Sequence, residues 1–190
     1  MIDKLTDKLE KLYLEVHNCL KFAEQKNGAF LVLNSTILAL LMKLFIDNAS
    51  NNSVDLFYCL LMSGFACVWV LLILSFLPSI FKLNFVMFFS PKQILDNNSI
   101  GNKTTKLNIS KYNLLYYKDI SRCKEDYFND LLCDQFGYKT EDLQPYDKLL
   151  MKQIWKLSRI GTGKFTIFAI AASLDAFLIA VFVITLLIVR

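Results

Sequence analysis

The sequence is poor in charge, histidine and proline. Charged residues make up 20% of the 190 positions and apolar residues 55%, with one histidine and three prolines. A soluble domain of this size carries about 45–50% apolar and about 25% charged residues. Because the apolar excess is concentrated in a few long runs, the composition excludes an ordinary soluble globule, a disordered chain, a collagen and a disulfide scaffold. A small integral membrane protein with a modest soluble part remains.

The sequence also lacks the residue clusters that carry catalysis or bind metals. It has no CxxC pair among its five cysteines, and its single histidine, His17, lies in the middle of a predicted helix. No Cys/His group has the spacing of a metal site, and no paired-carboxylate or Ser-His-Asp pattern is present. We therefore predict no enzyme activity, no metal and no cofactor, and we interpret the cysteines as structural thiols.

Three apolar runs are long enough to cross a membrane. They cover residues 29–46, 54–77 and 165–189. A helix needs roughly 20 mostly apolar residues to span about 30 Å of hydrocarbon. These runs show no alternation of apolar and polar residues, which excludes barrel strands. The predicted fold is an all-α integral membrane protein with three transmembrane helices and a small helical cytoplasmic region.

The distribution of basic residues predicts the topology. Residues 1–28 contain five lysines, residues 80–164 contain fourteen lysines and arginines, and the link at 47–53 contains none. Basic residues accumulate on the cytoplasmic side of a membrane. We therefore expect a multi-pass protein of the cell inner membrane. Residues 1–28 and 78–164 should lie on the cytoplasmic side, and the 47–53 link and the C-terminus on the external side. A cleaved signal peptide is not expected, because the first apolar run begins too late.

Apolar stripes predict three helices in the cytoplasmic region. They cover residues 2–22, 110–136 and 147–160, and no glycine or proline separates the first from the transmembrane run until Gly28. We expect that helix to continue into the membrane. Residues 91–109 read as a loop and residues 80–89 as an interfacial segment. So few helices make a minimal core, which predicts a homo-oligomer.

Polar residues inside the predicted spans point to an associated bundle. Asp175 lies near the middle of the third span, and Lys43 lies near the outer end of the first. A carboxylate at that depth ordinarily faces the interior of a bundle or water. Two arrangements remain open. Either Lys43 pairs with Asp175, or Asp175 is protonated and hydrogen-bonded between helices near Ser173 or Asn34.

The cytoplasmic region also contains candidates for binding an anionic ligand. Residues 80–164 have fourteen basic and nine acidic residues. Arginine forks grip phosphate oxygens, and tyrosines stack on bases. The ligand candidates are Arg122, Lys124, Arg159, Lys164 and Tyr116. The alternative is that they pack helices or set topology. No basic run or reader motif indicates nucleic-acid binding.

The segment at 160–166 is glycine-rich like a phosphate-binding loop, but its sequence does not fit that motif. It reads IGTGKFT, with Phe165 where a magnesium-binding Ser or Thr would stand, and it follows a helix instead of a strand. We interpret Gly161 and Gly163 as a flexible joint, with Lys164 at the level of the inner headgroups.

Three stretches together resemble the Pycsar-type transmembrane effector family. They are FAEQKNGAFLVLN at 22–34, NLLYYKDI at 113–120 and YDKLLMKQIWKLSRIGTGKF at 146–165. The positions that match the family pattern are Ala23, Glu24, Lys26, Asn113, Ile160 and Lys164. The resemblance implies an effector of bacterial anti-phage defence that senses cyclic CMP or cyclic UMP and impairs the inner membrane, causing abortive infection.

Two other functions stay open from the sequence. One is a non-enzymatic membrane scaffold or regulatory subunit that anchors a partner through its cytoplasmic helices. The other is a holin-like membrane toxin that needs no ligand. A transporter is disfavoured because three spans show no inverted repeat. The leading hypothesis has a cyclic mononucleotide, the lipid bilayer and further copies of the chain as its partners.

Overall fold

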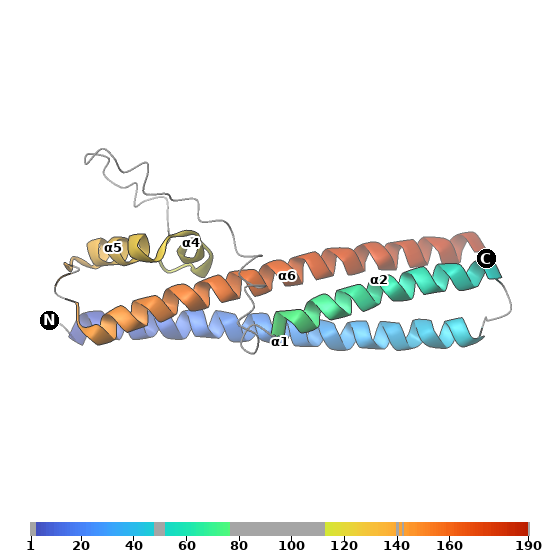
Figure 1. The fold of residues 1–190 in the computed structure, drawn as a ribbon, viewed down its shortest axis with the longest axis horizontal. Helices are drawn as coiled ribbons and strands as arrows, with labels where there is room; N and C mark the ends of the chain where they lie inside the picture. Colours follow the sequence, from blue (N-terminus) through green and yellow to red (C-terminus); the bar gives the residue numbers. More distant parts are fainter. Residues whose placement is uncertain (1–2, 48–51, 77–112, 140, 142, 190) are drawn as a thin grey trace, which may run out of the picture. The chain divides into compact units, whose positions relative to one another are not determined.

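The computed structural model describes residues 3–47, 52–76, 113–139, 141 and 143–189, and most of these residues are helical. The helices are α1 (Asp3–Asp47), α2 (Asn52–Phe76), α4 (Tyr117–Arg122), α5 (Glu125–Phe136) and α6 (Pro145–Val189) (Figure 1). No described residue forms a β-strand. Three helices, α1, α2 and α6, are long and apolar enough to cross a membrane. This confirms the predicted fold class.

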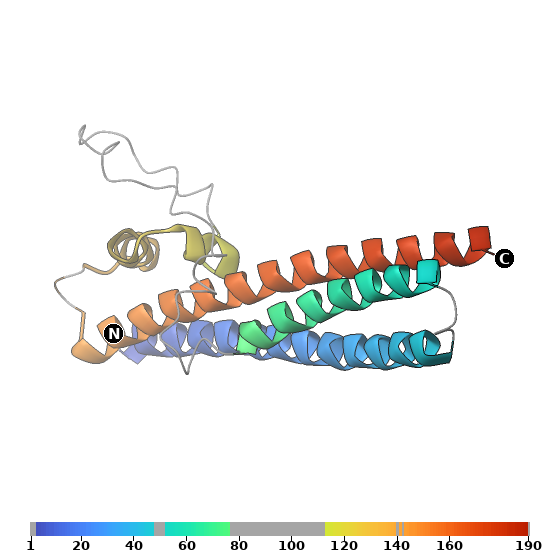
Figure 2. The same cartoon turned by 45° about the vertical axis from the view of Figure 1, so that its right-hand side comes forward.

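The described residues group into two compact units. Residues 3–22 and 113–163 belong to the first unit, and residues 23–76 and 164–189 belong to the second. Both α1 and α6 are unbroken helices that contribute residues to each unit (Figure 2). The continuity that the sequence predicted for α1 is therefore confirmed. The predicted loop at 91–109 and interfacial segment at 80–89 lie outside the described residues.

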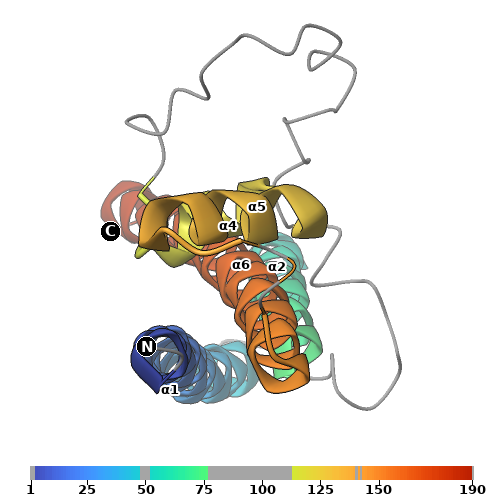
Figure 3. The ribbon, with the colours of Figure 1, turned by 90° about the vertical axis from the view of Figure 1, so that its left-hand side faces the viewer.

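The core of the first unit is a single apolar cluster shared by α1, α4, α5 and α6. Figure 3 shows α4 and α5 beside the first part of α6. The predicted stripe of α1 enters this core, since Leu5, Leu9, Leu12 and Val16 are all buried. Each fully buried side chain of this kind contributes about 1.5–3 kcal/mol. These contacts explain why the first part of α1 is helical despite its charged outer face.

The predicted helix at 110–136 is wrong, because the chain forms two helices there. Cys123 and Lys124 between them have extended backbones, with ψ angles of 149° and 152°. The extended step exposes the Cys123 carbonyl, which accepts a hydrogen bond of 2.9 Å from the Trp155 indole nitrogen. The predicted end at Gly137 is confirmed, since this glycine closes α5 in the left-handed conformation, with φ of 73°.

The prediction of a flexible joint at Gly161 and Gly163 is also wrong, because the helix does not break there. Both glycines lie inside the continuous α6. Glycine weakens a helix because it loses more backbone entropy than alanine does. Thr162, between the two glycines, donates its hydroxyl to the Ser158 carbonyl of the same helix.

The second unit is a bundle of three helices in mutual contact. Two apolar clusters fill it, one around Val68, Leu72 and Ala171, and the other around Leu41, Leu61 and Phe65. Gly64 on α2 lies against Leu178 on α6, so closely that a Cβ atom at position 64 would be 2.9 Å from the leucine methyl. The absence of a side chain at Gly64 lets these two helices approach.

We predict that two glycine-to-alanine substitutions have opposite effects on stability. Gly161→Ala should stabilise the protein by about 0.5–1 kcal/mol, because the position is helical and its added Cβ meets no described atom within 4 Å. Gly137→Ala should destabilise it by about 1–2 kcal/mol, since alanine resists a positive φ. Unfolding in detergent, followed by circular dichroism, measures both. Equal shifts of the same sign would contradict the assignment of the two backbone conformations.

Candidate ligand pocket and intramembrane polar contacts

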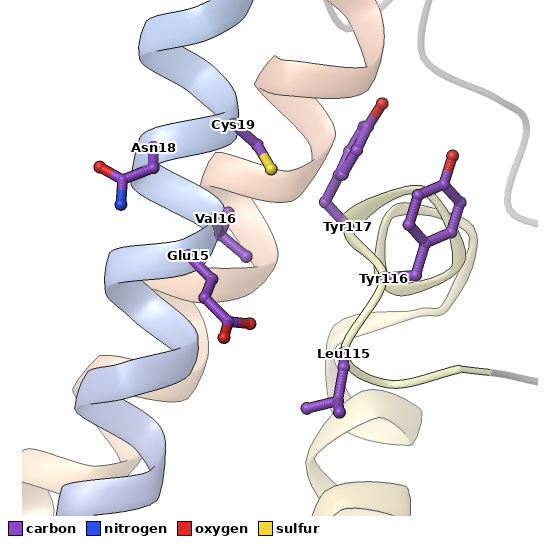
Figure 4. A pocket seen from close by; sticks show the side chains of 7 residues that line it. All are labelled: Glu15, Val16, Asn18, Cys19, Leu115, Tyr116 and Tyr117. Atoms are coloured by element: carbon purple, nitrogen blue, oxygen red, sulfur yellow. The ribbon is translucent and has the colours of Figure 1, made fainter.

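A pocket opens in the first unit between α1 and the turn that precedes α4. Its volume is about 350 Å³, and its lining residues are Glu15, Val16, Asn18, Cys19, Leu115, Tyr116 and Tyr117 (Figure 4). Small-molecule sites range from about 300 to 1,000 Å³, so this pocket has room for a small ligand. In Figure 4 the side chains of Glu15 and Cys19 point toward the turn, while that of Asn18 points away.

Asn113 shapes the turn that forms one wall of the pocket. Its side-chain Oδ1 accepts a hydrogen bond of 3.0 Å from the Leu115 amide, and its carbonyl accepts one of 2.9 Å from the Tyr116 amide. The Asn113 amide in turn donates to Asp119 at 3.3 Å. Asparagine suits such a turn because its side chain reaches the backbone two residues on. The family-pattern residue Asn113 therefore positions Tyr116 and does not itself line the pocket.

The pocket offers aromatic and acceptor groups but no cation. The rings of Tyr116 and Tyr117 lie 5.0 Å apart at an angle of 56°. Burial, and then the neighbouring Tyr116, raise the pKa of Tyr117 to about 12, so its hydroxyl stays protonated at neutral pH. Glu15 supplies a carboxylate, and no lysine or arginine is among the lining residues. This chemistry suits a flat ring that carries hydrogen-bond donors better than it suits a phosphate.

Arg159 packs against Trp155 elsewhere in the first unit, and Arg122 is the sequence neighbour of the residue to which Trp155 donates a hydrogen bond. The Arg159 guanidinium lies 5.0 Å from the Trp155 ring, and the Trp155 indole nitrogen donates to Cys123, the residue after Arg122. The Nε atoms of Arg122 and Arg159 are both buried and have no hydrogen-bond partner within the described part of the chain. Arg122 also lies 3.8 Å from Asp119. Arg159 thus lies on the Trp155 ring, Arg122 ends α4 next to the Cys123 carbonyl that Trp155 reaches, and Lys124 caps the start of α5.

Lys164 belongs to a different unit from the other ligand candidates. It belongs to the second unit, where its ammonium lies 2.5 Å from Glu24 Oε1 and 5.9 Å from the centre of the Phe76 ring. Its side chain is 4% exposed and that of Glu24 is 44% exposed. The sequence analysis treated Glu24 as a family-pattern position and Lys164 as a ligand candidate, and it missed that they pair. Their opposite charges at the ends of two apolar runs were the available signal.

The other family-pattern residues also make structural contacts. Ala23 is buried, the Lys26 ammonium lies 5.6 Å from the centre of the Phe168 ring, and Ile160 is half-buried. None of them lines the pocket. The pattern therefore marks packing positions of α1 and α6.

The interior of the second unit contains hydrogen-bonded polar side chains. Asn34 Nδ2 donates to Asp175 Oδ2 at 2.5 Å, so Asp175 is hydrogen-bonded between helices at Asn34, one of the two neighbours that the sequence offered. Lys43 is exposed, and no ion pair joins it to Asp175 in the described structure. Ser173 instead bonds to the Ala169 carbonyl of its own helix. A further buried pair, Asn27 to Ser75 at 3.0 Å, joins α1 to α2 and was not predicted.

The buried thiol beside the tryptophan is not a reactive nucleophile. Burial, and then the nearby Asp119, raise the pKa of Cys123 to about 11. Since thiolate is the reactive form, Cys123 stays protonated and inert at neutral pH. Within the described residues, no group of three His, Cys, Asp or Glu side chains is placed to hold a metal.

Comparison with known proteins identifies one family. The family model described as the Pycsar effector protein domain matches residues 8–190, nearly the whole chain. No curated protein matches the sequence significantly, and no solved structure does.

We predict that Glu24 stabilises the second unit by neutralising Lys164. Glu24→Ala would leave a buried ammonium without its carboxylate, and we expect a loss of about 1–3 kcal/mol, because part of the charge remains screened by solvent. The double substitution Glu24→Lys with Lys164→Glu should recover most of that loss. Gln25→Ala, at the exposed neighbour of Glu24, is the matched control for thermal unfolding in detergent. Equal stability of Glu24→Ala and Gln25→Ala would show that the pair contributes nothing.

Proposed function

The chain belongs to the Pycsar effector family, and from this premise we propose that it binds cyclic CMP or cyclic UMP in its first unit and then makes the inner membrane leaky. The family is one of membrane effectors of antiviral defence and is not a known enzyme family. In this proposal the nucleotide is a signal, and it is not chemically changed. Loss of membrane integrity would end the growth of an infected cell.

The observation that carries the proposal is the placement of the pocket and Arg122 at the two ends of α4. Tyr116 and Tyr117 lie at the start of this helix and Arg122 at its end. Arg122 follows Tyr117 by five residues, which is about 7.5 Å of helix. A cyclic nucleotide has an aromatic base at one end and a phosphate at the other, on a comparable scale. We therefore assign the base to the pocket and the phosphate to Arg122.

The two ends of this proposed site have the appropriate chemistry. The pocket has tyrosine rings for stacking and Glu15 as an acceptor, while a phosphate there would be repelled by that carboxylate. The buried, unpartnered Nε groups of Arg122 and Arg159 are donors that a phosphate oxygen would satisfy. Lys124, next to Cys123, adds positive charge. Lys164 is left out of this set because it is buried against Glu24.

The signal would pass to the membrane through α1 and α6. Glu15 in the first unit and Asn34 in the second both lie on α1. Arg159 in the first unit and Asp175 in the second both lie on α6. A ligand shifts an equilibrium only if it binds one arrangement more tightly than the other. We propose that the nucleotide favours a packing of α1 against α6 that differs from the one described here. The first unit must then face the cytoplasm, which agrees with the predicted topology of the basic residues.

We also propose that the protein works as a homo-oligomer. Leu14, Leu115 and Leu149 in the first unit are each more than half exposed. Apolar side chains outside a membrane favour burial against a partner. A second copy of the same chain is the simplest partner, because it carries the same surface.

The first test measures whether the nucleotide controls leakage. Purified protein in lipid vesicles that hold a potassium diffusion potential against external sodium should collapse that potential after cyclic CMP or cyclic UMP is added, because a leak admits sodium, and a potential-sensitive dye reports the change. Cyclic AMP is the control ligand. Collapse without any nucleotide would instead indicate a holin-like toxin. A potential that persists with every nucleotide would favour the scaffold function.

The second test locates the binding site. Tyr116→Ala should weaken nucleotide binding by about 5- to 150-fold, because stacking on a base contributes roughly 1–3 kcal/mol. Arg122→Gln and Arg159→Gln should each weaken binding through the lost phosphate contacts, while Lys156→Gln, at an exposed position of α6, should not. Isothermal titration calorimetry with cyclic CMP and cyclic UMP measures all four. Unchanged affinity in the Tyr116 and arginine variants would place the ligand elsewhere.

A further inference from the structure

The contact between Asn34 and Asp175 leaves two buried oxygens without partners. Asn34 is 0% exposed and Asp175 2% exposed, and one nitrogen of the amide donates to one oxygen of the carboxylate. Asn34 Oδ1 and Asp175 Oδ1 are buried and accept no hydrogen bond from any described group. A buried acceptor without a partner costs about 1–3 kcal/mol. A cation or a hydrogen-bond donor bound at these two oxygens would remove this cost.

The chemistry of these oxygens selects a cation. A carboxylate and an amide carbonyl are hard oxygen ligands, the type that alkali and alkaline-earth ions prefer. When it is ionised, Asp175 carries the only formal charge in the pair, and Lys43, the compensating charge that the sequence offered, is exposed and forms no ion pair with it in the described structure. A monovalent cation would balance this charge. Ionisable groups at membrane depth commonly mark ion pathways.

Two apolar clusters enclose the pair along the bundle. On α1, Phe30 and Leu31 belong to one cluster and Ile37, Leu38 and Leu41 to the other, so Asn34 lies between them. On α6, Ala171 belongs to the first cluster and Phe182 to the second, and Leu178 packs against both. Asp175 lies between these positions. Apolar constrictions of this kind block ions by excluding water, so the described packing is a closed state.

A second polar contact lies on the same face of α1. Asn27 precedes Asn34 by seven residues, which is two helical turns and about 10 Å. Asn27 donates to Ser75 on α2, and its Oδ1 is also buried without a described partner. The face therefore presents buried acceptor oxygens at two successive levels, separated by the apolar cluster of Val68, Leu72 and Ala171.

We propose that Asn34 and Asp175 form a binding site for a monovalent metal cation, and that this site makes the nucleotide-induced leak selective for cations. This inference rests on the proposed function, since it concerns the path that the nucleotide opens. When the apolar clusters separate, the carboxylate of Asp175 attracts cations into the bundle and repels anions. Asn34 holds the carboxylate in place and supplies the second oxygen ligand.

The test compares ion selectivity in vesicles that contain the intact protein. With cyclic CMP or cyclic UMP present, a KCl gradient should produce a reversal potential close to that of potassium. Asp175→Asn should lower the ratio of potassium to chloride permeability on the order of tenfold, because a single charge in a focused field changes local ion concentration by that amount. Asp175→Glu should retain the selectivity of the natural protein. Ser173→Ala, which removes only a hydroxyl bonded within α6, is the matched control.

The possible failures can be told apart. Equal potassium and chloride permeability in the natural protein, or unchanged selectivity in Asp175→Asn, would overturn the cation site and leave the proposed function standing. No nucleotide-dependent conductance for any ion would overturn both. Helicity and nucleotide affinity of the Asp175→Asn protein verify that it is folded. If it is not folded, Asp175→Ser, which also removes the charge, takes its place, with the same loss of selectivity expected.

Discussion

Polar side chains in the interior of an apolar helical bundle depend on one another, because neither lipid nor the surrounding leucines can satisfy them. In this protein Asn34 and Asp175 meet this requirement between α1 and α6, and Asn27 and Ser75 meet it between α1 and α2. Apolar contacts are not directional, whereas a hydrogen-bonded pair specifies one register of the helices. These contacts therefore define how the three spans pack, and the Glu24–Lys164 pair adds a third constraint at the start of the unit.

The same contacts make the packing sensitive to change. The amide and the carboxylate are only partly satisfied, since one oxygen of each has no described partner. An arrangement that supplied water or an ion to these oxygens would recover part of the cost of burying them. The described bundle is thus held by its apolar clusters and opposed by its unsatisfied acceptors. Under the proposed function, the nucleotide shifts this balance to the extent that it binds another arrangement of the first unit more tightly.

The sequence predicted the elements that rest on long, simple patterns. The three spans, the continuous α1 and the end of α5 at Gly137 followed from apolar length, the absence of breakers and glycine chemistry. It failed where a single distant contact decides the backbone. Nothing local at Cys123 and Lys124 indicates an extended step, which the hydrogen bond from Trp155 accompanies. The glycines at 161 and 163 suggested a joint, yet α6 continues through them.

The candidate site was less predictable than the fold, because it depends on which side chains the packing brings together. Charge and residue type pointed to Arg122, Arg159 and Tyr116, and the structure places Tyr116 in the pocket, Arg159 at Trp155 and Arg122 beside Asp119. The same reasoning could not separate Lys164 from them, because a lysine that is buried against a glutamate reads like any other lysine. Glu15 and Cys19 were missed since they lie beside the apolar stripe of α1 and carry no motif.

The central claim is that nucleotide bound in the first unit changes the packing of the second. Hydrogen–deuterium exchange of the vesicle-embedded protein tests this directly at residues 27–38 of α1 and 168–182 of α6. The account predicts faster amide exchange in both segments when cyclic CMP or cyclic UMP saturates the protein, because opening the apolar clusters admits water. Unchanged exchange there, with saturated binding and protection of the turn at 113–117, would contradict it.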